Sequence, residues 1–171
     1  KKNICLAFGK EISTFIRTNK YIPGQDLGIN EQDLDNIFTG SGELKSKIKH
    51  NLKSEYYTAL TVFLTLKAIL SFSNHNFCHA KVALEGFGKV GVQFALMLRS
   101  IDISLVGVSS VKGALYNNNG LDIEEIIKLQ KIYGDDFINH YQDGDKIANE
   151  ELITKQADIF IPGARPDSIN L

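Results

Sequence analysis

Apolar residues in the second part of the chain cluster in three short runs, at 82–84, 103–108 and 157–161. Segments typical of helices lie between these runs, at 90–100, 122–133 and 149–156. Short buried strands that alternate with helices of about ten residues predict a parallel sheet with helices on both faces. We therefore expect an α/β fold with a doubly wound, mainly parallel sheet.

The first part of the chain is predicted to be mainly helical. Apolar residues recur at helical spacing over 4–16, and a second helix is expected at 31–38, after Asn30 as its N-cap residue. A long helix is predicted at 54–72, whereas the polar segment 41–53 has no periodicity and is expected to be a surface loop. These helices are expected to precede the sheet as linking elements.

The first apolar run leads directly into a glycine-rich turn. Gly86, Gly88 and Gly91 have the G-x-G-x-x-G spacing. In such a turn the first glycine permits a tight bend, the second lets the backbone approach a pyrophosphate, and the third lets the next helix pack close to the strand. Three glycines in six residues also occur in ordinary turns. The strand, turn, helix and strand of a right-handed βαβ unit are the context that indicates a dinucleotide site.

These patterns predict a Rossmann-like domain at 74–171, preceded by a helical linking segment at 1–73. The linking segment includes a loop at 21–28, which Pro23 stiffens and which presents Asp26. Aspartate commonly stabilises its own turn in loops rich in proline and glycine. The residues alone therefore favour a structural role for Asp26.

Composition and charge narrow the classes of function. The chain of 171 residues has a net charge of −1, which gives no reason to expect nucleic acid or an anionic membrane as a partner. No apolar run approaches the ~18 residues of a membrane span and the start lacks a signal-peptide cleavage site, so we expect a cytoplasmic protein. Cys5 and Cys78 are expected to be free thiols, and 75–79 is interpreted as a loop, so no metal site is predicted.

Several motifs follow one another along nearly the whole chain, at 21–28, 57–62, 86–91, 112–117, 120–122 and 157–162. In this order they resemble the Glu/Leu/Phe/Val (amino acid) dehydrogenase family. The order is more specific than any single motif, because the glycine-rich turn alone occurs in many unrelated nucleotide-binding proteins.

In enzymes of that family an L-amino acid is oxidatively deaminated to a 2-oxo acid and ammonia, while a hydride passes to NAD or NADP. The resemblance implies that Asp26 is catalytic and moves protons as a general acid and base, and that the hydroxyl of Thr58 lies near the nicotinamide. It also implies a small-molecule substrate and a homo-oligomer for the complete protein. The predicted cofactor-binding residues are Thr58, Gly86, Phe87, Gly88, Lys89, Val90, Gly91, Ser110, Lys112, Gly163 and Ala164.

Departures from the family pattern change some of these expectations. The family's N-terminal catalytic lysines and its later strand and helices have no counterpart here, so we interpret the chain as a fragment that is inactive alone. Ser110 stands where an acidic residue usually binds the ribose, and Lys112 follows, which leaves both NAD and NADP open. Asp167 replaces an asparagine near the cofactor, and Ala59 and Thr61 replace glycines.

Two alternatives follow from these departures. The first is a diverged, non-catalytic paralogue of the family with a structural or regulatory role. The second is an unrelated Rossmann enzyme, against which the ordered motifs outside the glycine-rich turn argue. The sequence does not identify the amino acid that serves as substrate.

Overall fold

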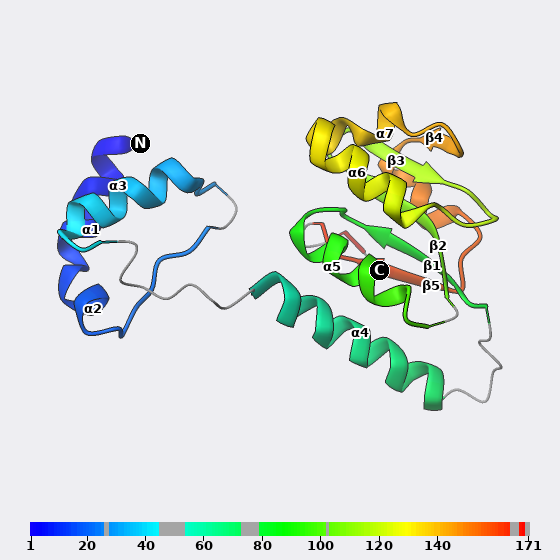
Figure 1. Cartoon of the computed structure of the whole chain (residues 1–171), viewed down its shortest axis with the longest axis horizontal. Helices are drawn as coiled ribbons and strands as arrows, with labels where there is room; N and C mark the ends of the chain where they lie inside the picture. Colours follow the sequence, from blue (N-terminus) through cyan, green and yellow to red (C-terminus); the bar gives the residue numbers. More distant parts are fainter. Residues whose placement is uncertain (26–27, 45–53, 73–78, 102, 165–167, 170–171) are drawn as a thin grey trace. The chain divides into compact units, whose positions relative to one another are not determined.

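The computed structural model describes the chain except for residues 26–27, 45–53, 73–78, 102, 165–167 and 170–171. The chain forms two compact units, Lys1–Leu52 and Lys53–Leu171 (Figure 1). The sequence places the boundary near residue 73, after the long helix α4 (Ser54–Phe72). In the structure α4 packs against α5 (Lys89–Leu98) and belongs to the second unit.

The described part of the first unit contains three helices, α1 (Lys2–Glu11), α2 (Ser13–Arg17) and α3 (Glu31–Ser41). Helices α1 and α3 approach closely because each has a glycine in the contact. A Cβ on Gly9 would lie 2.0 Å from the carbonyl oxygen of Ile37, and one on Gly40 would lie 2.1 Å from that of Leu6. The core of this unit contains Cys5, Ile16, Leu34, Ile37 and Phe38.

The helix starts and ends in this unit differ in part from the predicted ones. Asn30 is confirmed as an N-cap, because its side chain accepts a hydrogen bond from the N–H of Asp33 at 2.9 Å. The single helix predicted for the first 16 residues is divided at Ile12. Helix α3 continues beyond its predicted end at residue 38, through Gly40, which packs against α1. It ends at Ser41, and the C-cap residue Gly42 has a left-handed φ of 72°.

The second unit contains a five-stranded sheet in the order β4-β3-β2-β1-β5 (Figure 1). The strands are β1 (Lys81–Glu85), β2 (Ser104–Ser110), β3 (Gly113–Tyr116), β4 (Asp145–Ile147) and β5 (Ile159–Pro162). Strand β1 is parallel to β2 and β5, whereas β3 is antiparallel to β2 and to β4. The α/β class is confirmed, but the sheet is mixed. The two residues between β2 and β3 can connect only antiparallel strands, because a parallel crossover needs a dozen or more residues.

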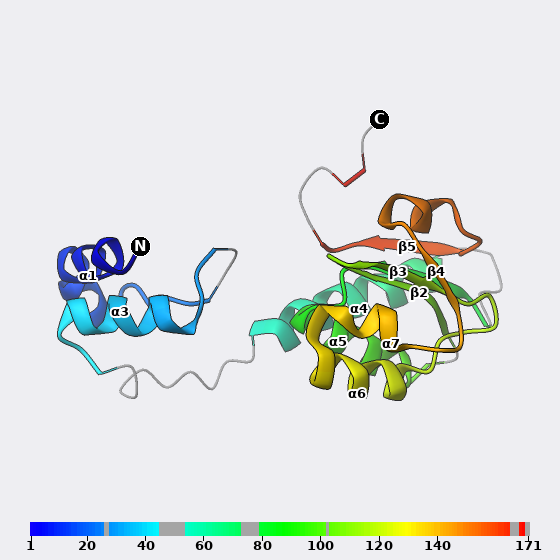
Figure 2. The same cartoon turned by 90° about the horizontal axis from the view of Figure 1, so that it is seen from above.

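Helices cover the two faces of this sheet unequally. The remaining helical elements are α6 (Ile123–Tyr133), η2 (Gly134–Asp136), α7 (Phe137–His140) and the 3-10 helix η3 (Asn149–Thr154). Helices α4 to α7 lie on one face, over a large core that includes Phe63, Phe94 and Ile126, and η3 lies on the other, where Leu152 packs on Ala83 (Figure 2). The segment predicted as a helix at 149–156 is thus a 3-10 helix, and the doubly wound arrangement stays a prediction.

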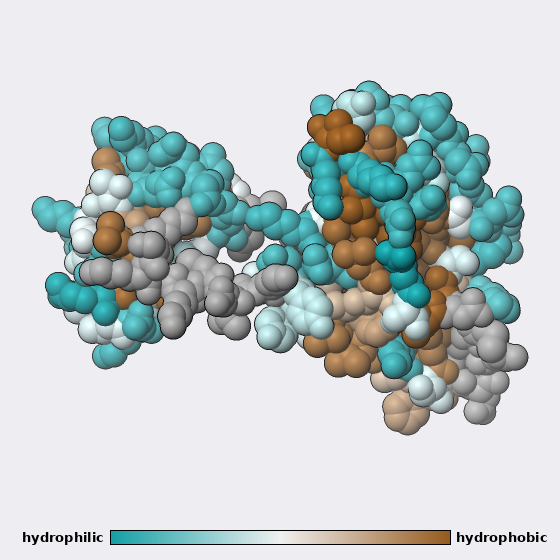
Figure 3. Space-filling view, in the orientation of Figure 1, coloured by the Kyte–Doolittle hydropathy of each residue, from teal (hydrophilic) through white to brown (hydrophobic). Residues whose placement is uncertain are grey.

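Helix α4 is apolar around much of its circumference, but only one side of it is buried. Phe63 and Leu66 contribute to the core, whereas Leu64 is 54% exposed and Phe72 is 89% exposed. Ile69 is also exposed. Figure 3 shows apolar side chains gathered over the part of the second unit that contains α4 and α5.

Candidate functional site

The carboxyl ends of β1, β2 and β5 lie at one edge of the sheet, because these three strands are adjacent and parallel. The chain passes from β1 through α5 to β2 on one side, and later reaches β5 on the other side of β1. Ligands of open α/β sheets bind in the crevice outside the carboxyl ends at such a switch point. The fold therefore places a candidate site at the loops that follow Glu85, Ser110 and Pro162.

The glycine-rich turn after β1 is attached to the end of β2. The N–H of Gly86 donates to the hydroxyl of Ser109 at 3.0 Å, and the N–H of Phe87 donates to the carbonyl oxygen of Ser109 at 2.8 Å. Gly86 has a φ of 92°, a backbone conformation that residues with a Cβ rarely adopt. A Cβ at this position would lie 3.1 Å from the Cα of Ala164. Gly86 thus forms the tight turn, while its contact with a cofactor stays a prediction.

Gly91 and Gly88 meet different surroundings at the start of α5. A Cβ on Gly91 would lie 2.3 Å from the carbonyl oxygen of Gly86, so this glycine lets α5 pack close to β1. A Cβ on Gly88 would have no described atom within 4 Å. Gly88 is the N-cap residue of α5, and no side chain in the described part of the chain caps this helix. The first backbone N–H groups of α5 belong to the exposed residues Lys89 and Val90. They are therefore suited to an anionic ligand.

The loop after β5 lies against the other side of the turn. A Cβ on Gly163 would lie 3.0 Å from the carbonyl oxygen of Glu85, and Ala164 lies against Gly86. The structure thus brings together predicted residues that are far apart in the sequence. Ser109, which is only 2% exposed, was not predicted. The signal that could have identified it is a polar residue near the end of an apolar strand.

Ser110 at the end of β2 is held by three hydrogen bonds. Its hydroxyl donates to the backbone carbonyl oxygen of Asp135 at 2.8 Å and accepts the N–H of Lys112 at 3.0 Å. Its own carbonyl oxygen accepts from the side-chain amide of Asn149 at 2.9 Å. The structure therefore places η2 beside Ser110 and Lys112, a neighbourhood that the sequence does not predict.

Asp136, the last residue of η2, is surrounded by polar partners. The Asn139 amide donates to its carboxylate at 2.8 Å, and the imidazole of His140 lies 3.2 Å from it. The hydrogen bond from Asn139 lowers the pKa of Asp136, and His140 and Lys112 act in the same direction. Asp136 is therefore ionised at neutral pH. The ring of Tyr133 stacks on His140, with ring centroids 3.6 Å apart.

The two residues with predicted roles in the reaction are not joined to the glycine-rich turn by any described contact. Thr58 lies exposed on α4, and its hydroxyl donates to the carbonyl oxygen of Ser54 at 2.9 Å. Asp26 lies outside the described residues, as does Asp167. The described geometry therefore concerns the cofactor side of the predicted site.

Two oxygen atoms near this edge of the sheet are buried without a hydrogen-bond partner among the described residues, Oε2 of Glu85 and Oδ1 of Asn149. Glu85 ends β1, and Asn149 binds the end of β2 through its amide nitrogen. An unsatisfied buried acceptor costs about 1–3 kcal/mol. Both atoms are therefore positions at which a donor from water or a ligand would be favourable.

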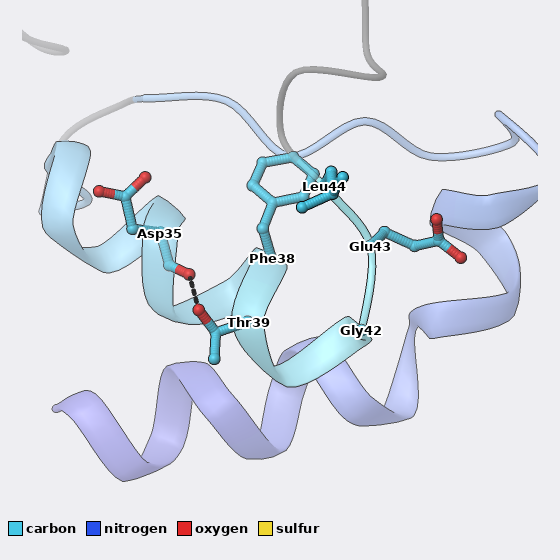
Figure 4. A pocket seen from close by; sticks show the side chains of 6 residues that line it. All are labelled: Asp35, Phe38, Thr39, Gly42, Glu43 and Leu44. Carbon is cyan, nitrogen blue, oxygen red and sulfur yellow. Dashed lines mark hydrogen bonds between the residues drawn. The ribbon is translucent and has the colours of Figure 1, made fainter.

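A shallow pocket of about 330 Å³ lies in the first unit, at the end of α3. Phe38 and Leu44 form its apolar side, and the carboxylates of Asp35 and Glu43 point to opposite sides (Figure 4). It contains none of the predicted site residues. Among the described residues, no group of three His, Cys, Asp or Glu could hold a metal ion, and no helix is long and apolar enough to cross a membrane.

The ordered motifs and the glycine-rich turn agree with a match to a known family. Residues 51–171 match the family model of Glutamate/Leucine/Phenylalanine/Valine dehydrogenase. The chain belongs to this family.

Curated relatives of the chain are glutamate dehydrogenases of different cofactor specificity. An NAD-specific glutamate dehydrogenase from Staphylococcus aureus is 30% identical over 94% of this chain and 41% of its own length. An NADP-specific glutamate dehydrogenase from Saccharolobus shibatae is 27% identical over 93% of this chain and 40% of its own length. The chain thus spans about 40% of these relatives.

Solved structures of glutamate dehydrogenases share the fold. The hetero-hexameric glutamate dehydrogenase from Thermus thermophilus superposes with a TM-score of 0.75 at 20% identity, over 99% of this chain and 42% of that chain. The glutamate dehydrogenase from Plasmodium falciparum superposes with a TM-score of 0.69 at 18% identity, over 99% of this chain and 41% of that chain. At this identity the similarity shows the fold alone.

Proposed function

We propose that the chain is the NAD(P)-binding portion of an amino acid dehydrogenase, which oxidatively deaminates an L-amino acid to a 2-oxo acid and ammonia. The observation that carries this proposal is the glycine-rich turn. It lies at the switch point of three parallel strands, where α5 begins with backbone N–H groups that no described side chain caps. Membership in the dehydrogenase family supports the reaction class.

In this proposal the pyrophosphate of NAD or NADP lies at Gly88. The open space in front of Gly88 admits a phosphate, and the positive end of the α5 dipole favours its charge. The adenine ribose extends toward Ser110 and Lys112 at the end of β2, and Gly163 and Ala164 flank the turn on the other side. Phe87, which is 2% exposed, supports the turn from the core.

The chemistry is proposed for the complete protein, because this chain spans about 40% of its relatives. Asp26 transfers protons as a general acid and base, and Thr58 lies near the nicotinamide. The chain alone is inactive, since one carboxylate cannot also polarise the substrate carbonyl. The complete protein acts as a homo-oligomer in the cytoplasm. Glutamate is the first substrate to test, because the relatives described above are glutamate dehydrogenases.

Calorimetric titration of the chain with NADH and NADPH tests the cofactor proposal. Gly88→Ala adds a methyl group where no described atom lies within 4 Å, so the fold is retained while the space for the pyrophosphate is reduced. We expect binding to weaken at least about tenfold, with little change in Tm.

Gly24→Ala is the matched control, because a Cβ there also has no described atom within 4 Å and Gly24 lies in the other unit. Its affinity should equal that of the wild type. Failure of the wild type to bind either dinucleotide, or full binding by Gly88→Ala, contradicts the proposal.

A diverged, non-catalytic paralogue is the second candidate. It is favoured by Ala59 and Thr61, which stand at glycine positions of the family pattern on α4. Both candidates predict dinucleotide binding, so turnover separates them. An assay of the complete protein with a panel of L-amino acids, including glutamate, leucine, phenylalanine and valine, and either cofactor gives product for the enzyme and none for the paralogue.

A further inference from the structure

The end of the second strand is where dinucleotide-binding folds distinguish NAD from NADP. An acidic side chain there binds the ribose hydroxyls of NAD, whereas a nearby arginine accommodates the 2′-phosphate of NADP. Here β2 ends at Ser110, which has no carboxylate, and the basic Lys112 follows. This local sequence permits NADP.

Helix η2 brings the residues Asp135 and Asp136 to this place from a distant part of the chain, through the backbone carbonyl of Asp135. The hydroxyl of Ser110 donates to the backbone carbonyl oxygen of Asp135 at 2.8 Å and accepts the N–H of Lys112 at 3.0 Å. Its single proton is thus in use, and Ser110 cannot donate to a phosphate without releasing Asp135. Asp135 is exposed, and Asp136 follows it directly in η2.

The formal charges of Lys112, Asp135 and Asp136 are negative in sum. Lys112 contributes one positive charge, and Asp135 and Asp136 contribute two negative charges. Lys112 lies close enough to Asp136 to help lower the pKa of its carboxyl, after the hydrogen bonds from Asn139 and His140. Lys112 thus has an acidic neighbour in Asp136, and Asp135 adds a second negative charge.

Resting on the proposed function, we propose that Asp135 and Asp136 make this site prefer NAD over NADP. A 2′-phosphate carries about two negative charges, and these carboxylates repel it. The ribose of NAD instead presents hydroxyl groups, which can donate to carboxylate oxygens. In other dinucleotide sites an acidic residue at the end of the second strand binds the ribose hydroxyls. In this proposal the two aspartates of η2 have that function.

Dissociation constants of NADH and NADPH, measured by calorimetry at constant ionic strength, test this inference. We expect the wild-type chain to bind NADH at least about tenfold more tightly than NADPH. The double variant Asp135→Asn/Asp136→Asn should reduce this ratio at least about fivefold through tighter NADPH binding, with the affinity for NADH within about threefold of the wild type.

Two further variants control for folding and for net charge. Asp135→Asn alone keeps the backbone carbonyl that binds Ser110, and it should change the ratio in the same direction by a smaller factor. Asp145→Asn removes an equal charge from the exposed strand β4 and should leave the ratio unchanged.

Each other outcome has a definite meaning. NADPH binding as tight as NADH binding in the wild type, or an unchanged ratio in the double variant, overturns the inference while the proposed function stands. If the wild type binds neither dinucleotide, the proposed function fails, and the inference fails with it.

Discussion

Gly91 and Gly88 belong to one motif but differ in what an added methyl group would meet. In Gly91→Ala the Cβ would lie 2.3 Å from the carbonyl oxygen of Gly86, which is backbone and cannot rotate away. We expect this variant to lose about 2–4 kcal/mol of unfolding free energy, measured by urea denaturation. Gly88→Ala, with no described atom within 4 Å, should lose less than about 1 kcal/mol. Equal losses in the two variants would contradict the close packing of α5 on β1.

The glycine positions could be predicted from spacing, whereas the partners of the turn could not. The motif determines which backbone positions must be free of side chains, so Gly86 and Gly91 have local explanations. The hydrogen bond from Gly86 to Ser109 depends on the register of β1 on β2, and the contact with Ala164 depends on β5 pairing beside β1. Asp135 reaches Ser110 only through the position of η2. No local pattern encodes such contacts.

At the scale of elements, the start of α6 is held from two sides. The side chain of Asp122 accepts the N–H groups of Glu124 at 2.9 Å and Glu125 at 3.0 Å, as an N-cap residue does. Asp122 and Glu125 have the three-residue spacing of a capping box, in which Glu125 would accept the N–H of Asp122. The described contact is instead from this N–H to the hydroxyl of the buried Tyr141, at 2.9 Å. A long-range partner thus replaces the local one.

Tyr141→Phe should therefore destabilise the second unit by about 1–2 kcal/mol, because the N–H of Asp122 loses its acceptor. Burial raises the pKa of Tyr141 above its ordinary value of 10.0, so the neutral hydroxyl is the form that stabilises the fold. This stability is fully present below pH about 10 and is lost as the pH rises through the folded-state pKa. Urea denaturation between neutral pH and pH about 11 should show this loss in the wild type and not in Tyr141→Phe.

Tyr133→Phe is the control for this substitution, because Tyr133 is exposed at the end of α6. It should change the stability by less than about 0.5 kcal/mol. If the two variants are equally stable, the hydrogen bond to Asp122 contributes nothing to the folded state.

Elements with strong apolar patterns were predictable, and those held by tertiary contacts were not. The runs at β1 and β2 are buried strands, as their apolar residues indicate, whereas the run at β5 forms a strand that is only partly buried. Strand β4 was missed because it is three residues long and its Asp145 and Lys146 are exposed at the edge of the sheet. In α1, Ile4 and Phe8 are exposed although their spacing predicted burial, since the small residue Gly9 determines which side approaches α3.

At the scale of the molecule, each unit has a core formed by its own residues. The core of the second unit draws on α4, the sheet and α5 to α7, and all of its members lie within 53–171. Among the described residues of the first unit, the core contains five buried side chains from three helices. A chain of about 50 residues with so small a core is marginally stable by itself. The two units therefore differ in how far they can fold alone.

Residues 53–171 produced without the first 52 residues should fold and unfold cooperatively, because every buried side chain of their core is retained. We expect a Tm within about 5 °C of the main transition of the whole chain, measured by circular dichroism, and an affinity for NADH within about threefold. Residues 1–52 alone should have little helical signal, since isolated short helices are marginal in water. A failure of 53–171 to fold would show that its core is incomplete without the first unit. Loss of NADH binding with the fold intact would instead place part of the cofactor site in residues 1–52.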